Sequence, residues 1–576
     1  MLRTRAACLA ILVLAIVPAV TSAHPERPTV FPQTDGGSPV PPKAEIPTYR
    51  SRGPSNVVCK SDSGARLRQM FKDDKRVLKS RLKTLKRCKF HDIQPAVNAA
   101  KSGYRILLMP GVYQEKPSRE TPVGSYQEGP CPNDYTETEG FRNTGPPPAG
   151  PRSNDPPVRP DRNFHLKCPN SKNLIMVAGD PRPETDAQHP TIPKCTQLCN
   201  LQIAGLGKDP GDVLIEGDRQ KSDVLRIDRA WGIYLRNFTI EQAEFNDIDL
   251  VEVNGFRISK IVARYAQNYG VLSFTSTNGL YDNDVAYGNG DSGLYPGSSE
   301  KGCDIPPNSY GTCNQLTPGN PQGGCERQTI EIRDSDSYGN TLGYSGTAGN
   351  STWVHDNKFH DNATGMTTDS FAQGHPGMPQ ECVKWERNQI YSNNNNVFDQ
   401  KRQRYCIDTP FPVRKREIVC PQFQTAVGTG ILIGGGNRNL IRQNAIYDNY
   451  RWGVLLIGVP ASIRNDNDPD HQLDTSNGNR FLHNAMGHNL AGDRLPNGLD
   501  FKWDSQGAGN CFEANASSGA GHTSDPVNLP ACPGSPASQP ANAAVIAPLV
   551  GCTAWDPFKN PDPLGCDWFV TPPKPQ

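Results

Sequence analysis

Short apolar runs separated by polar turns recur along residues 210–515, with a period of about two dozen residues. Each unit contains an apolar run, a polar turn, a second apolar run, and then Asn and Gly. The clearest copies are residues 224–247, 248–270, 271–293 and 344–365. One such repeat cannot bury its apolar side by itself, so the period predicts a stacked architecture.

The apolar runs have the chemistry of strands. Those at residues 213–215, 430–433 and 453–457 are rich in β-branched residues and bounded by Gly, Asn or Asp. No stretch of this region keeps a 3.6-residue apolar period for three turns. Two or three short strands per repeat with no helix between them predict an all-β fold, the coil of a β-helix.

Asparagine recurs at one place in the coil, and an apolar residue follows two positions later. The matching positions are Asn283, Asn357, Asn388, Asn444 and Asn484. Asn tolerates left-handed backbone angles and bonds to neighbouring backbone. Stacked coils would align these side chains into a hydrogen-bonded ladder. We therefore interpret them as structural residues.

The chain opens with the pattern of a secretory signal peptide, which we assign to residues 1–23. Removing it takes two Arg from the 60 basic residues and none of the 59 acidic ones, which leaves a net charge of −1. This balance argues against nucleic acid as a partner. No later apolar segment approaches the ~20 residues of a membrane span. We expect a secreted, extracellular monomer.

Cysteines support export. Of 17, Cys8 leaves with the signal peptide, and the remaining even number predicts disulfides, whose connectivity the sequence leaves open. The spacing of Cys195 and Cys199 could suit a metal site, but the sequence has no second close Cys pair with the spacing of zinc ligands.

The chain divides into five parts. After the signal peptide, residues 24–55 form a linker rich in Pro and Gly, and residues 56–112 a helical cap with the first strand. Within the cap, residues 62–88 predict a basic amphipathic helix packed on the coil. Residues 113–515 form the β-helix with inserted loops, and residues 516–576 a Cys-containing tail.

Residues 92–115, DIQPAVNAAKSGYRILLMPGVYQE, resemble the opening of right-handed parallel β-helix proteins of the pectate-lyase-like class. In that class a short helix caps the first coil and covers its pairing edges. Residues 364–393 resemble secreted, actinobacterial-type proteins with right-handed β-helix repeats. The resemblance implies the fold for most of residues 90–515. It hardly constrains the reaction, because this fold carries lyases, hydrolases, epimerases and non-enzymes.

A groove is predicted from loop insertions. Strands that follow Gly293, Gly365, Asn396, Gly430 and Gly453 are equivalent in this alignment, and insertions at residues 298–327, 370–382, 400–428 and 459–478 follow four of them. Insertions at equivalent points emerge on one side of a solenoid. An elongated groove suits an extended polymer, so we expect an extracellular polysaccharide as partner.

Alternation along those strands selects candidate site residues. Leu294, Met366, Val397, Ile431 and Val454 should point inward, and Tyr295, Thr367, Phe398, Leu432 and Leu455 outward. The predicted catalytic residues are Asp369, His375, Asp399 and Arg402, and the predicted substrate-binding residues are Tyr295, Phe398, Lys401 and Arg404. A base and a cation suit β-elimination on uronate polymers, whereas two carboxylates suit glycoside hydrolysis. We assign no metal ligand and no obligatory cofactor, with calcium the one candidate.

Three alternatives stay open. Asp and Asn are also plain turn residues, and the chain lacks the Arg-Ile-Lys and groove Asp-Asp motifs of polygalacturonase-like chains. A non-catalytic adhesion solenoid would present the same groove without convergent ionisable groups. His355 and His360, each followed by Asp-Asn, suggest a periplasmic metal-handling accessory, although five residues along a coil turn a corner.

Overall fold

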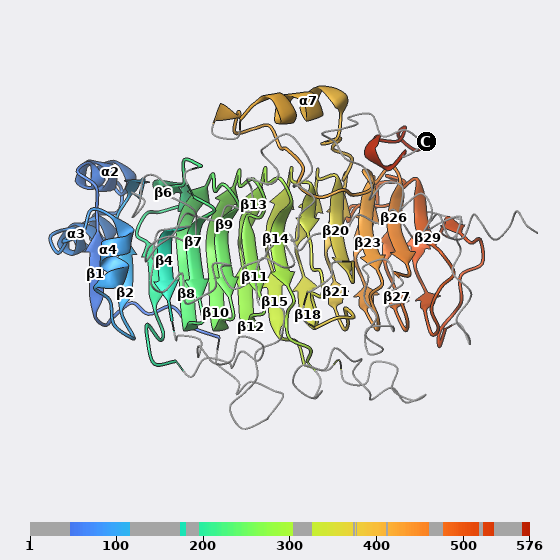
Figure 1. Ribbon diagram of the computed structural model, residues 1–576, viewed down its shortest axis with the longest axis horizontal. Coiled ribbons are helices and arrows are strands. Elements are labelled where there is room, and N and C mark those ends of the chain that lie inside the picture. Colours follow the sequence, from blue (N-terminus) through green and yellow to red (C-terminus); the bar gives the residue numbers. More distant parts are fainter. Residues whose placement is uncertain are drawn as a thin grey trace, which may run out of the picture.

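The computed structural model describes residues 46–115, 173–179, 195–219, 221–302, 325, 327–371, 375, 377–410, 413–459, 476–517, 522–534 and 567–576. These residues form a right-handed parallel β-helix, as predicted, in which stacked coils run from the helical cap to the C-terminal end (Figure 1). The predicted signal peptide and most of the predicted linker lie outside the described residues.

One side of the coil is an eleven-stranded parallel sheet. Consecutive strands of the sheet come from consecutive coils. They are β4 (Asn173–Ala178), β7 (Asp223–Asp228), β9 (Asn246–Val251), β11 (Val271–Phe274), β14 (Ser292–Gly297), β17 (Leu342–Tyr344), β20 (Thr364–Asp369), β23 (Thr429–Gly434), β26 (Trp452–Ile457), β29 (Leu499–Trp503) and β32 (Ser524–Asp525).

The other two sides of the coil belong to a 21-stranded sheet, which bends within its two long strands, β8 (Trp231–Glu241) and β10 (Asn254–Arg264). The first part of β10 pairs with one strand of the next coil and its last part with another, so the sheet has two halves. We call the first half ladder 1; besides β8 and β10 it contains β1 (Ser55–Val58), β2 (Arg105–Leu108), β5 (Gln202–Gly205), β12 (Thr277–Asp282), β15 (Ile330–Arg333), β18 (Thr352–His355), β21 (Lys384–Glu386), β24 (Leu440–Arg442), β27 (Arg480–Leu482) and β30 (Cys511–Glu513). Ladder 2 contains β3 (Gly111–Tyr113), β6 (Val213–Glu216), β13 (Val285–Tyr287), β16 (Asp336–Tyr338), β19 (Lys358–His360), β22 (Gln389–Tyr391), β25 (Ala445–Tyr447), β28 (Ala485–Met486) and β31 (Ala516–Ser517).

Inward side chains from all three sides form one continuous core. Leu294, Met366, Ile431 and Val454 are aligned in the eleven-stranded sheet and fully buried in this core, as predicted. Ladder 1 contributes Val354, Trp385, Ile441 and Phe481 at the alternate positions of its strands. Burial of an inward position in every coil explains why the apolar period is visible in the sequence.

The predicted asparagine ladder lies at the bend between ladders 1 and 2. Asn357, Asn388, Asn444 and Asn484 are linked by side-chain hydrogen bonds of 3.0 to 3.1 Å. Asn283 was wrongly included, since it is exposed, and Asp284 holds the buried position beside it. The left-handed backbone falls on the residue before each ladder Asn, as in Asp356 and Arg387, and not on the Asn itself.

The N-terminal end carries the predicted helical cap (Figure 1). Helix α4 (Ile93–Asn98) covers the first coil. Residues 62–88 form two helices rather than one, α2 (Ser63–Met70) and α3 (Lys75–Leu85), because the Asp74 side chain caps α3 by accepting from the Val77 amide. Leu67 and Leu78 pack with Val57 and Leu107 on the outer side of ladder 1.

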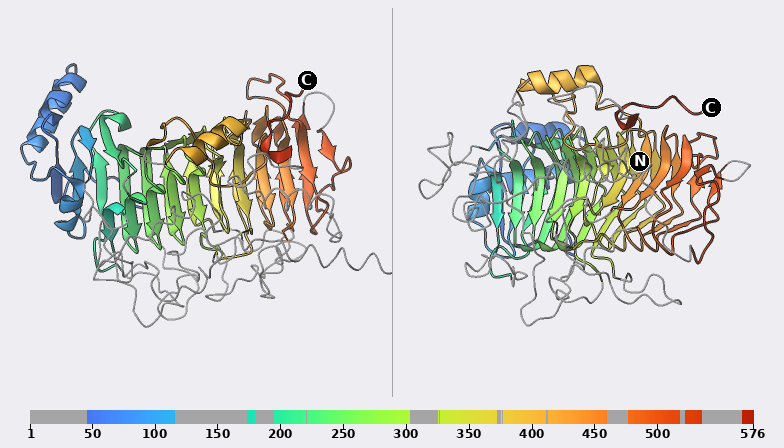
Figure 2. Two further views of the ribbon diagram at one scale, coloured as in Figure 1. Left: turned by 45° about the horizontal axis from the view of Figure 1, so that its top comes forward. Right: turned by 45° about the vertical axis from the view of Figure 1, so that its right-hand side comes forward.

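Three shorter elements lie outside the sheets. Helix α7 (Gln400–Asp408) projects from the edge where β22 leads into β23, and 3-10 turns form at η2 (Pro210–Asp212) and η6 (Asp567–Phe569) (Figures 1 and 2). Most of the described helical residues lie in the cap, in α2, α3 and α4, and α7 is a further helix that the sequence pattern did not predict. No helix in the described part of the chain is long and apolar enough to cross a membrane.

Five disulfides are present among the described cysteines, as an oxidising compartment favours. They are Cys59–Cys88, Cys195–Cys199, Cys325–Cys382, Cys406–Cys420 and Cys511–Cys532. Cys195 and Cys199 therefore bond to each other, and in this disulfide neither sulfur is a thiolate that could bind a metal. Cys325–Cys382 ties together the insertions that follow β14 and β20.

Candidate functional site

The insertions border the eleven-stranded sheet on two edges, not one. Those that begin after β14, β20 and β26 leave the same edge of the sheet. Residues 392–428, in contrast, precede β23 and leave the opposite edge (Figure 1). The alignment at Asn396 was wrong because no strand of the sheet follows it, and Val397 lies in a separate apolar cluster outside the coil.

The outward side chains of β14, β20, β23 and β26 are buried, and Tyr295 and Phe398, two aromatic residues that were expected to be accessible, are both buried. Tyr295 packs on Tyr269, with ring centroids 4.5 Å apart, and Phe398 packs on Phe569 at 4.7 Å. Over β20, β23 and β26, the apolar cover comes from the chain itself. Leu432 and Leu455 share this outer cluster with Phe398, Val427, Trp568 and Phe569.

Asp369 and His375 lie on the same side of the coil but not together. Asp369 ends β20, is buried, and accepts hydrogen bonds from the Thr347 hydroxyl at 3.1 Å and the Phe371 amide at 3.0 Å. The His375 ring contacts the edge of Phe274 in β11. Three strand steps separate β11 from β20, about 14 Å at the usual spacing. Their catalytic role stays a prediction.

The other predicted site residues belong to α7. The Asp399 carboxylate caps this helix by accepting from the Arg402 amide at 3.0 Å, and it also pairs with Arg402 Nε at 3.3 Å. Lys401 and Arg404 are exposed on the same helix. This capping contact explains Asp399 structurally, and the structure does not place these four residues beside Asp369.

An ionic cluster on the eleven-stranded sheet escaped sequence analysis. Arg226 of β7 pairs with Asp228 at 2.8 Å, with Asp249 of β9 at 2.9 Å and with Asp223 at 3.5 Å, and all four side chains are buried. The Asn246 amide also donates to Asp223 at 2.9 Å. The available signal was the charge inside the apolar runs 223–228 and 246–251, where Arg226, Asp228 and Asp249 occupy outward positions.

A second charged group lies on the outer side of ladder 1. The buried Glu386 carboxylate contacts Lys384 at 3.3 Å, Arg387 at 2.9 Å and Arg442 at 2.6 Å, and it accepts from Trp353 Nε1 at 2.9 Å. Burial favours the neutral acid, but these hydrogen bonds and charges outweigh it and lower the pKa of Glu386 to about 2. The carboxylate is therefore ionised at neutral pH.

The predicted histidine pair does not converge on a metal. His355 belongs to ladder 1 and bonds Asp356 at 2.6 Å and Glu331 at 3.2 Å. His360 belongs to ladder 2 and bonds Asp361 at 2.6 Å and Asp336 at 2.9 Å. Carboxylates thus occupy both nitrogens of each ring, and the two rings lie on different sides of the bend.

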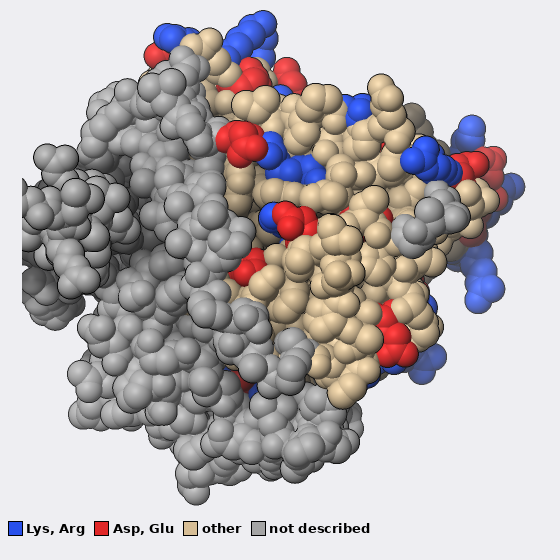
Figure 3. Space-filling model, turned by 90° about the vertical axis from the view of Figure 1, so that its right-hand side faces the viewer, with Lys and Arg blue, Asp and Glu red and all other residues tan. Residues whose placement is uncertain are grey.

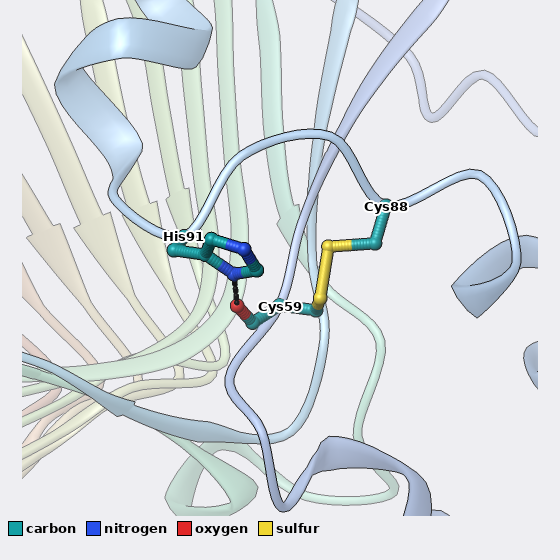
Figure 4. A group of neighbouring side chains, drawn as sticks. All are labelled: Cys59, Cys88 and His91. Carbon is teal, nitrogen blue, oxygen red and sulfur yellow. Dashed lines mark hydrogen bonds between the residues drawn. A yellow bond between two sulfur atoms is a disulfide. The ribbon is translucent and has the colours of Figure 1, made fainter.

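Among the described residues, one group of potential metal ligands converges, at the cap (Figure 4). Cys59, Cys88 and His91 offer ligand atoms within 4.8 Å of one another. The two sulfurs, however, form a disulfide, and His91 Nδ1 contacts the Cys59 carbonyl at 3.0 Å. Since a metal binds thiolates and not a disulfide, we interpret the Cys59–Cys88 disulfide as a structural link within the cap.

Comparison with models of known protein families found no match. Comparison with curated proteins found none either. Solved structures are similar in fold only. The A-module of mannuronan C-5 epimerase AlgE6 from Azotobacter vinelandii has 15% identity and a TM-score of 0.37, over 74% of this chain and 95% of that one. Pectate lyase Pel9A has 10% identity and a TM-score of 0.30, over 77% and 74%. The DFA-IIIase of Arthrobacter chlorophenolicus A6 has 8% identity and a TM-score of 0.36, over 64% and 71%.

Proposed function

We propose that the protein binds and processes an extracellular acidic polysaccharide on the outer side of the eleven-stranded sheet, by proton abstraction and β-elimination at a uronate. The observation that carries the proposal is the Arg226 cluster, in which one guanidinium lies among three buried carboxylates. Burying ionisable groups is costly for folding, and such clusters concentrate at functional sites.

The cluster contains the two kinds of group that β-elimination needs. A cation must neutralise the uronate carboxylate so that the neighbouring proton becomes acidic, and a base must remove that proton. We assign the first role to Arg226, which would exchange one of its three carboxylate partners for the uronate, and the second to Asp249, whose carboxylate lies 2.9 Å from the guanidinium. An arginine suits the first role because its planar fork matches a carboxylate.

The aromatic side chains next to the cluster support a sugar polymer as substrate. Val251, Tyr269, Leu272, Phe274 and Tyr295 form one buried apolar cluster, which begins in the strand of Asp249 and continues in the next coils. Apolar and aromatic side chains beside a few polar groups are typical of ligand sites. Asp369 and His375, farther along the same side, are the candidates for contacts with more distant sugar units.

The test is turnover of a panel of acidic polysaccharides, with and without calcium, in three assays. Ultraviolet absorbance detects the unsaturated product of elimination, reducing ends detect hydrolysis, and proton NMR detects epimerisation. We expect Asp249→Asn to lower kcat by a factor of about 100 or more, as for loss of a general base. Asp369→Asn tests the second region in the same assays.

Asp334→Asn is the matched control, because Asp334 is an exposed turn residue with a positive φ that Asn tolerates. It should retain full turnover. If Asp249→Asn folds and keeps wild-type turnover, the base lies elsewhere. If the wild-type protein binds the polymers and none of the three assays detects a product, the non-catalytic adhesion alternative replaces this proposal.

A further inference from the structure

Ladder 1 presents a charged surface on a different side of the coil from the proposed catalytic side. Trp353, Lys384, Leu440 and Arg480 form one outward column on β18, β21, β24 and β27, in register from strand to strand. His355, Glu386, Arg442 and Leu482 form the second column. We call Lys384, Arg387, Arg442 and Arg480 the basic face.

From β18 to β27, basic side chains outnumber carboxylates, and Glu331 of β15 and Glu513 of β30 border this surface. Two carboxylates pair with the basic face, that of Glu386 and that of Asp356, which bonds Arg387 at 2.9 Å. In the described part of the chain, Arg442 reaches Glu386 only through Nε, which leaves its terminal amino groups for another anion. Arg480 has no ion pair with any described residue.

Lys384, Arg387 and Arg442 are held by contacts within the protein before any ligand arrives. Trp353 stacks on His355, with ring centroids 4.0 Å apart, and Lys384 Nζ lies 4.7 Å from the indole centroid. Neighbouring strands fix the cations at steps of about 4.8 Å along the solenoid axis. Pre-organised charges lose little side-chain entropy on binding, which favours recognition of a long anionic chain.

We propose that the basic face binds an acidic polysaccharide as a second, non-catalytic site, which keeps the polymer attached to the protein. A uronate chain carries one carboxylate per sugar, and a sugar is about as long as one coil step. Duplex DNA carries one charge per ~1.7 Å of its axis, far denser than this surface. The choice of a polysaccharide rests on the proposed function, whereas the binding itself needs no turnover.

The predicted binding is electrostatic, because the Trp353 ring is already in contact with His355 and Lys384. It should therefore weaken as salt rises, because exposed charges are screened over ~10 Å at 0.1 M ionic strength. A site dominated by sugar stacking on aromatic rings would respond little to salt. The salt dependence thus tests the nature of the contact as well as its existence.

The experiment uses fluorescence anisotropy of an end-labelled decamer of polygalacturonate in calcium-free buffer. We expect the double variant Arg442→Gln/Arg480→Gln to bind about tenfold more weakly than the wild type, with a shallower salt dependence. Arg480→Gln alone, which breaks no ion pair with a described residue, should weaken binding about threefold. Turnover of a short soluble substrate should stay at the wild-type level in both variants.

Lys79→Gln/Lys83→Gln is the matched control, since it removes the same total charge from the exposed side of α3. It should bind like the wild type. Equal loss in this control, or wild-type affinity in a folded Arg442→Gln/Arg480→Gln protein, would overturn the proposal. So would equally tight binding of a single-stranded oligodeoxynucleotide. Loss of turnover in Asp249→Asn with decamer binding retained would separate the two sites.

Discussion

Two outer surfaces of the same coils have opposite characters. Over β20, β23 and β26, the eleven-stranded sheet presents Leu432, Leu455 and Ile457, which the chain's own segments bury. Over β18 to β27, ladder 1 presents charged side chains that stay partly exposed. The inward side chains of these coils all belong to one apolar core. The difference between the covered and the open surface therefore comes from the outward side chains.

The covered surface depends on residues that are distant in the chain. Arg451 connects them, because its Nε donates to the Val427 carbonyl at 3.0 Å and its Nη1 pairs with Asp567 at 3.0 Å. The Val427 amide donates in turn to the Trp568 carbonyl at 2.8 Å. The segment before β23 and the C-terminal turn η6 thus close over the sheet as one unit (Figure 2).

The end of the solenoid is different again. Viewed from the C-terminal end, the described surface is mostly uncharged, with separate acidic and basic side chains (Figure 3).

The strongest test of the comparison places the same charge on both surfaces. Leu432→Asp puts a carboxylate under the apolar cover, where Leu432 is 5% exposed, and should lower the free energy of unfolding by at least about 4 kcal/mol. Leu440→Asp makes the same change on the partly exposed surface and should cost about 1 kcal/mol or less. Urea unfolding measures both, and similar losses would show that the two surfaces do not differ in burial.

A second test concerns how charge is tolerated on ladder 1. Glu386→Gln leaves Lys384, Arg387 and Arg442 without their shared carboxylate and should cost about 3 kcal/mol. Glu331→Gln removes a carboxylate that is 24% exposed and should cost about 1 kcal/mol or less. Thermal unfolding compares the two. Equal effects would mean that the buried position of Glu386 has no special importance.

The third test addresses the buried asparagine ladder inside the coil. Asn388→Ala removes a buried side chain that donates to the Val354 carbonyl at 2.9 Å and to Asn444 at 3.1 Å. Loss of these bonds and the unsatisfied partners should cost about 2 kcal/mol. Hydrogen exchange should rise in both β21 and β22, which flank Asn388 at the bend between ladders 1 and 2. Faster exchange in only one of the two strands would contradict a role of the ladder in both.

Sequence predicted the inner structure well, because every coil imposes the same physical demand. The inward positions of Met366 and Ile431 and the ladder through Asn388 follow from a repeated need for burial and turn bonding. The outer structure has no such repetition. Asn396 resembled a coil turn locally, yet it leads into α7, and Phe398 is buried by Phe569 from the end of the chain. Such long-range cover leaves no periodic signal.

The candidate site divides in the same way. Asp369 is the last residue of β20 and lies at an outward position, which strand alternation in the sequence predicts. The Arg226 cluster was not predicted, because its charged residues lie inside short, mostly apolar strands, where the sequence pattern indicates burial and no site. His375 belongs to an insertion, whose path depends on tertiary contacts such as that with Phe274.

The smallest expected effect tests ladder 2, which joins the covered and open surfaces. His360 lies in a stack of rings, 5.2 Å from Tyr338 and 4.8 Å from Tyr391. Burial opposes its protonation, but hydrogen bonds to Asp336 and Asp361 outweigh this and raise the pKa of His360 to about 9, from the ordinary 6.5. The charged ring therefore stabilises the fold fully below pH 6.5, and this contribution disappears as the pH rises through 9.

Because both carboxylates are partly exposed, the contribution should be about 1 kcal/mol. The measurement is the difference in unfolding free energy between the wild type and His360→Gln at pH 6, 8 and 10, which cancels other titrating groups. We expect the difference to be largest at pH 6, clearly smaller at pH 8 and smallest at pH 10. A difference that does not change with pH would mean that the ring contributes by stacking alone, and that charge stabilises only the open surface of ladder 1.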